Sequence, residues 1–122
     1  MSFYVTLEAK QDTFKGVLQT EFNKAFRLRG EWEVGIISCY TPKFESVFWV
    51  FSNIVDFTYV NEVPMQLMDV LETGKLKIRK PLYSKVIKKT ISSINMEFKH
   101  QPTSDNFLIS TDIVCILHFR KA

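Results

Sequence analysis

The 122-residue sequence has few of the residues that interrupt or cross-link a chain: four glycines, four prolines and two cysteines. Two cysteines are too few for the disulfide framework of a small secreted protein. A chain of this length needs none, because one core buries roughly two-thirds of the unfolded surface. No apolar run reaches the roughly 18 residues of a membrane-spanning helix. The first residues lack a basic segment, and Glu8 and Lys10 interrupt any apolar stretch, so we expect no signal peptide and synthesis in the cytosol.

The sequence also lacks the motifs of common catalytic and metal sites. It has no Cys-x-x-Cys pair, His-Glu-x-x-His, glycine-rich phosphate loop or Gly-x-Ser-x-Gly. Cys39, Cys115 and His118 could suggest zinc, but they lack ligand spacing, and thiols within apolar runs favour two buried cysteines. We expect His100 and His118 to be polar surface residues or hydrogen-bonded histidines. The sequence therefore predicts a protein that is not an enzyme and uses no cofactor or metal.

Aromatic residues are abundant: they make up 14% of the chain, with 11 Phe, 4 Tyr and 2 Trp, and they favour strands. Apolar and polar residues alternate with a period of two in most of the segments that we expect to be strands, while 47–51 is apolar on both faces. Roughly eight short strands predict an all-β fold, a single jelly-roll-like antiparallel β-sandwich with little helix, in one domain spanning 1–122. The expected strands are 3–8, 17–30, 31–40, 47–51, 54–60, 75–79, 94–99 and 113–120.

Two segments are open to a second interpretation. Val17–Ala25 is rich in helix-forming residues, but Leu18, Thr20 and Phe22 alternate with more polar residues, which favours a strand. Val63–Leu71 places three apolar residues at helical spacing, which predicts a short helix or an irregular lid. Within the clearest strand, Trp32, Val34 and Ile36 share one face, and we expect that face to lie in the core.

Charge is unevenly distributed, although the net charge is only +3. The segment 44–74 has five acids and no base, and the segment 75–89 has seven bases and no acid. Three interpretations remain open: a solvated strand face and loop, a contact between the basic segment of one copy and the acidic segment of the next, and, least favoured, a nucleic-acid patch. The residues are Glu45, Asp56, Glu62, Asp69 and Glu72, then Lys75, Lys77, Arg79, Lys80, Lys85, Lys88 and Lys89.

Strands that are apolar on both faces predict a second cover, which in so small a sandwich is often another subunit. This applies to Val47–Phe51 and Val114–Ile116. We expect Phe48, Trp49, Val114 and Ile116 to form the apolar centre of a contact between copies, with Trp49 equally compatible with the core. Asp56 is either an outward-facing carboxylate or the partner of a base across that contact.

Several motifs, in order, resemble a protein family encoded by Maverick/Polinton-type virus-like elements and related animal DNA viruses. The opening strands resemble its "FYVTL" and "GEWEVGL" motifs, and Asn61-Glu62 stands where that family has Gly-Asp. The matching segments are Phe3–Leu7 (FYVTL), Gly30–Ile36 (GEWEVGI), Tyr40–Pro42 (YTP), Val50–Val55 (VFSNIV), Val60–Met65 (VNEVPM), Pro81–Tyr83 (PLY), Ile91–Met96 (ISSINM) and Val114–Arg120 (VCILHFR).

The resemblance implies a virion structural protein, a minor capsid or penton-like jelly roll, and it carries no catalytic residues. The partners expected are further copies of the chain, as a trimer or pentamer, and other capsid proteins. No small-molecule substrate or membrane is expected. The alternative is a small β-sandwich module that binds nucleic acid or a host protein through the basic segment 75–89.

Overall fold

The computed structural model describes residues 2–10, 16–41, 47–72, 80–103 and 112–122. These residues form strands and connections, with no helix among them. No described helix, accordingly, has the length and apolar character needed to cross a membrane. The strands are β1 (Ser2–Ala9), β2 (Val17–Arg27), β3 (Trp32–Tyr40), β4 (Val47–Ser52), β5 (Thr58–Val60), β6 (Val63–Met65), β7 (Leu67–Glu72), β8 (Tyr83–Lys85), β9 (Thr90–Lys99) and β10 (Ile113–Lys121).

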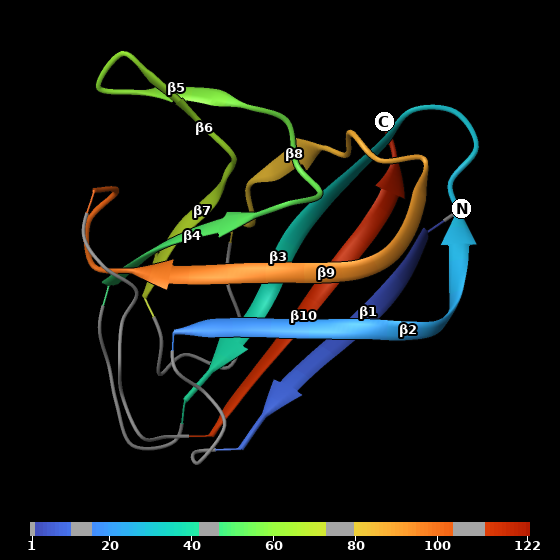
Figure 1. Cartoon of the computed structure of the whole chain (residues 1–122), viewed down its shortest axis with the longest axis horizontal. Coiled ribbons are helices and arrows are strands. Elements are labelled where there is room, and N and C mark those ends of the chain that lie inside the picture. Colours follow the sequence, from blue (N-terminus) through green and yellow to red (C-terminus); the bar gives the residue numbers. More distant parts are fainter. Residues whose placement is uncertain (1, 11–15, 42–46, 73–79, 104–111) are drawn as a thin grey trace.

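The strands form two four-stranded antiparallel sheets that face each other, in the orders β1-β10-β3-β8 and β2-β9-β4-β7 (Figure 1). Early strands pair with late ones: β1 with β10, β2 with β9, β3 with β8, and β4 with β7. Nested pairs of this kind, divided alternately between two sheets, are the connectivity of a jelly roll. The predicted antiparallel jelly-roll sandwich is therefore confirmed.

The core lies between the sheets and follows the alternation of each strand. In β10, Ile113, Cys115, Leu117 and Phe119 are buried while the residues between them are partly exposed. In β3, Trp32, Val34 and Ile36 are buried, as predicted. Successive strand residues point to opposite faces, so a period of two in the sequence becomes one apolar face on each sheet.

The strand assignment of Val17–Ala25 is confirmed, because it forms most of β2. The helix or lid expected over Val63–Leu71 is wrong, because β6 and β7 occupy that segment. In the pairing of β4 with β7, Val50 lies opposite Asp69 and Phe51 opposite Leu67, so Met68 of β7 has no partner residue in β4. That bulge turns a period of two into an apparent spacing of three, which imitates a helix in the sequence.

The strand expected over 54–60 is shorter in the structure. Only Thr58–Val60 forms a strand, whereas Ile54 and Val55 turn into the core, where both are fully buried. The strand expected over 75–79 lies outside the described residues.

A second, smaller hairpin of β5 and β6 projects from the sandwich (Figure 1). Its two central residues, Asn61 and Glu62, have φ values of 50° and 68°. Two residues with positive φ form a type I′ turn, whose twist matches that of the strands it joins. Glu62 is a costly residue for that conformation, since only glycine adopts it without a steric penalty.

Candidate interaction surfaces

The four apolar interface candidates lie in three different environments. Phe48 is 3% exposed and packs edge-on against Phe98, with ring centroids 5.9 Å apart, so it belongs to the core and is not available to a second copy. Trp49 is half-buried in β4, directly opposite Lys99 of β9. Val114 and Ile116 are half-buried in β10, on the outer face of the other sheet. The residues that we expected to form the apolar centre of a contact between copies are therefore divided between the core and the outer faces of two sheets.

The acidic candidates are similarly dispersed. Glu62 and Glu72 are exposed, and Asp56 is an outward-facing carboxylate whose Oδ1 accepts a hydrogen bond from the Phe57 N–H at 2.8 Å. Asp69 is only 8% exposed, and its burial raises the pKa of the carboxyl above the usual value. The N–H of Val70 donates to Asp69 at 2.7 Å, which partly opposes that shift. Asp69 is thus unsuited to a surface contact.

Two bases of the predicted basic segment contact an acid of their own chain. Lys85 and Lys89 lie 3.9 Å and 3.8 Å from the carboxylate of Glu31, and Lys89 also donates to the carbonyl of Gly30 at 2.8 Å. These side chains are about 60% exposed, so each ion pair contributes roughly 0–1 kcal/mol. Lys80 and Lys88 are exposed. Lys75, Lys77 and Arg79 lie outside the described residues.

The two cysteines face each other in the core across β3 and β10. Their sulfur atoms are 3.0 Å apart, and burial raises the pKa of the Cys115 thiol well above its usual value. Both are free thiols, as the sequence predicted. His118 lies on the opposite face of β10, so the three residues do not converge on a zinc ion. Across the described ranges, no group of three His, Cys, Asp or Glu side chains could hold a metal.

His118 is a hydrogen-bonded histidine, one of the two states expected. Its Nδ1 lies 2.7 Å from the Tyr83 hydroxyl, and its ring stacks on Tyr4 with centroids 4.7 Å apart. Gly35 pairs with both His118 and Tyr83, and a Cβ there would come within 3.2 Å of the Tyr83 ring. The Arg120 guanidinium lies 3.5 Å from the centroid of that ring. These contacts join β1, β10, β3 and β8 across the outer face of their sheet.

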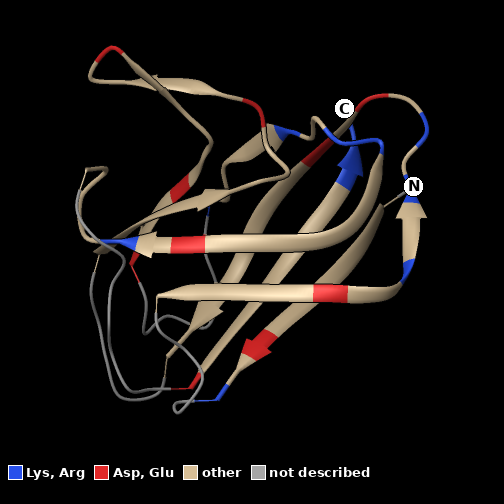
Figure 2. Ribbon diagram, in the orientation of Figure 1, with Lys and Arg blue, Asp and Glu red and all other residues tan. Residues whose placement is uncertain are grey.

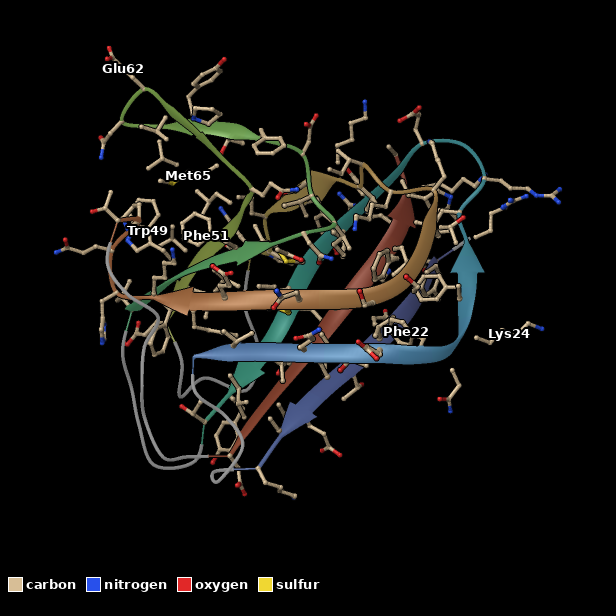
Figure 3. The ribbon with its side chains drawn as sticks, in the orientation of Figure 1. Phe22, Lys24, Trp49, Phe51, Glu62 and Met65 are labelled. Atoms are coloured by element: carbon tan, nitrogen blue, oxygen red, sulfur yellow. The ribbon has the colours of Figure 1, made fainter. Side chains whose placement is uncertain are left out.

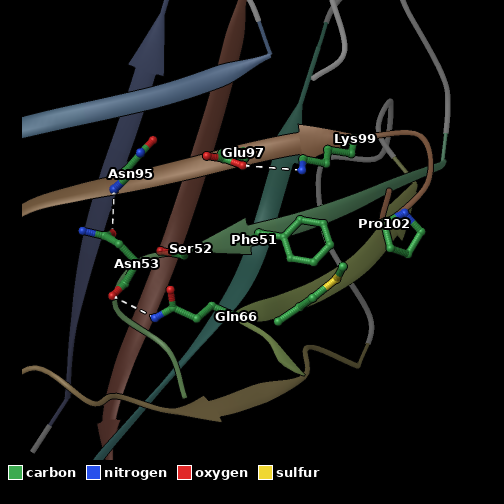
Figure 4. Close-up of a pocket in the computed structure, with 9 residues that line it drawn as sticks. Phe51, Ser52, Asn53, Gln66, Asn95, Glu97, Lys99 and Pro102 are labelled. Carbon is green, nitrogen blue, oxygen red and sulfur yellow. Dashed lines mark hydrogen bonds and ion pairs between the residues drawn. The ribbon is translucent and has the colours of Figure 1, made fainter. Parts of the chain in front are cut away.

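A hollow of about 260 Å³ lies on the outer face of the other sheet, beside the β5–β6 hairpin (Figure 4). Asn53 accepts a hydrogen bond from the Asn95 N–H at 2.9 Å, and Gln66 donates to the carbonyls of Asn53 and Val55 at 3.3 Å and 3.0 Å. These amides fasten the turn after β4 to β9 and to the residue that joins β6 and β7. The volume is below the roughly 300–1,000 Å³ of typical ligand sites. The lining residues are Phe51, Ser52, Asn53, Met65, Gln66, Asn95, Glu97, Lys99 and Pro102.

A larger aromatic groove of about 510 Å³ lies between the sheet edges β1 and β2. The core is open here: Phe3 contacts both Phe26 and Trp32, with centroids 5.6 Å and 5.5 Å away, and Phe22 packs on Phe26 at 5.2 Å. A register shift in β2 between Glu21 and Phe26 interrupts its pairing with β9. We define the aromatic groove by its lining residues: Phe3, Tyr4, Val5, Phe22, Phe26, Arg27, Leu28 and Trp32.

The β5–β6 hairpin carries exposed apolar side chains. Tyr59 is 80% exposed, and Phe57 and Val63 are also exposed. Tyr59 pairs with Pro64, and the neighbouring pair is Thr58 with Met65. Since successive residues alternate between faces, Tyr59 and Pro64 point away from the hollow that Met65 lines. Sequence reasoning identified neither this hairpin face nor the aromatic groove; the aromatic residues themselves were the available signal.

The aromatic groove and the hairpin offer apolar side chains together with charged ones, a combination suited to contact with another molecule. Comparison of the chain with protein-family models, with curated proteins and with solved structures found no match.

Proposed function

We propose that this protein is a non-enzymatic virion structural protein that assembles with copies of itself as a minor capsid or penton-like subunit. The jelly-roll connectivity supports this proposal, because capsid subunits are among the main users of that fold. The order of motifs that resembles the Maverick/Polinton-type family supports it independently. Fold alone does not decide function, however, because unrelated functions share one fold.

The observation that carries the proposal is a pair of surfaces that offer apolar side chains, the aromatic groove at the open end of the core and the β5–β6 hairpin. Phe22 and Phe26 are half-buried in the aromatic groove, whereas the hairpin exposes Tyr59. Exposed apolar patches on a soluble domain mark sites of association. Aromatic residues are also enriched where protein interfaces are most strongly stabilised. A protein that buries these surfaces against neighbouring copies would remove them from water, which favours assembly.

The proposed assembly is a homo-oligomer, a trimer or pentamer, that also contacts other capsid proteins in the virion. Rings with an odd number of subunits need heterologous contacts, in which two different surfaces of the protein meet. The groove and the hairpin are two such surfaces. The experiment is light scattering after size-exclusion chromatography over a range of protein concentrations. We expect one discrete oligomer mass without added ligand.

The competing function, a binding module that uses the segment 75–89, predicts a different result. It would give a monomer whose nucleic-acid affinity falls steeply with salt, because bound phosphates release counterions. Lys88→Glu tests the segment cleanly, since Lys85 and Lys89 also contact Glu31. If Lys88→Glu weakens nucleic-acid binding to a monomeric protein, the structural role is wrong.

A further inference from the structure

The aromatic groove and the exposed apolar face of the hairpin lie far apart on one molecule. The long axis of the protein is horizontal in Figure 3, with Glu62 of the hairpin tip at the upper left and Phe22 and Lys24 of β2 at the right. A groove and a hairpin at opposite ends cannot meet within one chain. If they meet at all, they join neighbouring copies.

The charges at these two ends are opposite. The hairpin and its flanks, 56–66, hold Asp56 and Glu62 and no base. The segment 24–29, at the end of β2 beside the groove, holds Lys24, Arg27 and Arg29 and no acid. Figure 2 shows the acid at the hairpin tip and the bases near the end of β2. Arg27 itself lines the groove. Complementary charge of this kind orients partners and raises the rate of encounter.

The hairpin and the aromatic groove also match in shape and in their side chains. The hairpin is a narrow projection with a hydrogen-bonded type I′ turn, so it loses little conformational freedom on binding. Its outward face presents Tyr59 and Pro64, and the groove is lined by the rings of Phe3, Phe22 and Phe26. Tyrosine offers a large ring for such a pocket and a hydroxyl that can stay in contact with water.

We infer that the β5–β6 hairpin of one copy docks Tyr59 into the aromatic groove of the next copy, with Glu62 facing Arg27. This inference rests on the proposed function, because it names the contact by which the protein assembles. The contact is heterologous, so each copy uses its hairpin once and its groove once, and repetition closes a ring or extends a filament. It differs from the contact predicted from sequence, in which the acidic segment meets the segment 75–89, because here the basic partner of the hairpin is the end of β2.

The first test compares single variants by analytical ultracentrifugation. Tyr59→Ala should weaken association by about thirtyfold, the effect of losing an aromatic anchor of about 2 kcal/mol. Leu82→Ala is the matched control: Leu82 is 52% exposed but lies on neither surface, so this variant should assemble like the wild type. Glu62→Arg and Arg27→Glu should each weaken assembly, and the double variant should recover much of it. Circular dichroism checks that each variant is folded.

The second test mixes two defective chains. Tyr59→Ala retains an intact groove, and Arg27→Glu retains an intact hairpin. Mixed at a concentration where each alone is a monomer, they should form a one-to-one dimer through the single intact contact. A mixture that remains monomeric overturns the head-to-tail contact.

The outcomes separate the inference from the proposed function. If the wild type remains a monomer at all concentrations, both are wrong. If the wild type assembles and both Tyr59→Ala and Glu62→Arg assemble equally well, the inferred contact is wrong and self-assembly stands. If the wild type is monomeric and the groove instead binds a peptide of another protein, that second occupant also overturns the inferred contact.

Discussion

Replacing Trp32 with alanine should destabilise the fold by about 4 kcal/mol. Trp32 is 5% exposed, at the end of the core that opens into the aromatic groove. Burying an aromatic ring removes about 200 Å² from water, worth about 5 kcal/mol at roughly 25 cal/mol per Å². Alanine retains about 1 kcal/mol of that, because its methyl group stays buried. The result lies within the roughly 3–5 kcal/mol typical of tryptophan-to-alanine changes in cores.

Two local contacts of Trp32 allow a matched control. Its ring lies 5.5 Å from that of Phe3, and its Nε1–H donates to the carbonyl of Arg29 at 2.8 Å. Trp32→Phe keeps most of the buried ring and loses the hydrogen bond, so it should cost about 1–1.5 kcal/mol. The difference between the stability losses of the two variants therefore separates the contribution of the buried ring from that of the hydrogen bond.

The assay is urea unfolding, followed by the fluorescence of the remaining tryptophan, Trp49, and by circular dichroism. It is performed at a concentration where the protein is monomeric, because assembly through the groove would add to apparent stability. The midpoint should fall without a large change in slope. A loss below about 1 kcal/mol for Trp32→Ala would refute the reasoning, since surface changes usually stay within about 0.5 kcal/mol.

Four further outcomes are expected. Gly35→Ala should lower the free energy of unfolding by about 1–3 kcal/mol, because the new Cβ would lie 3.0 Å from the carbonyl oxygen of Leu82 and 3.2 Å from the ring of Tyr83. Glu62→Gly should raise it by about 0.5–1 kcal/mol in thermal unfolding, by relieving the positive φ in the hairpin turn. The pKa of Asp69 is raised above its ordinary value of 3.8, so its contribution to stability is fully present below pH 3.8 and is lost as the pH rises through the pKa of the folded state. Asp69→Asn should remove this decline in the free energy of unfolding, and an unchanged pH profile of stability would contradict the prediction. Cys39 and Cys115 should react with a maleimide only after unfolding, as mass spectrometry would show; rapid labelling of the native protein would disprove their burial.

The sequence alone determined most of the long strands and their inward faces, but not β6, β7 or β8. Alternation in β3 placed Trp32 and Ile36 in the core, and the same pattern in β10 placed Cys115 there. This information is local, because a strand buried on one face repeats its apolar residues with a period of two. The number of strands and their brevity then predicted the sandwich.

The tertiary structure decided every property that depends on which strands become neighbours. Irregularities opposite Val50/Phe51 and between Glu21 and Phe26 shift the register, and the local pattern at the first of them imitates a helix. Pairing of distant strands brought Lys85 and Lys89 to Glu31, and it opened the aromatic groove between two unpaired edges. Such contacts join residues far apart in the chain, so alternation can show which way a side chain points but not what it meets.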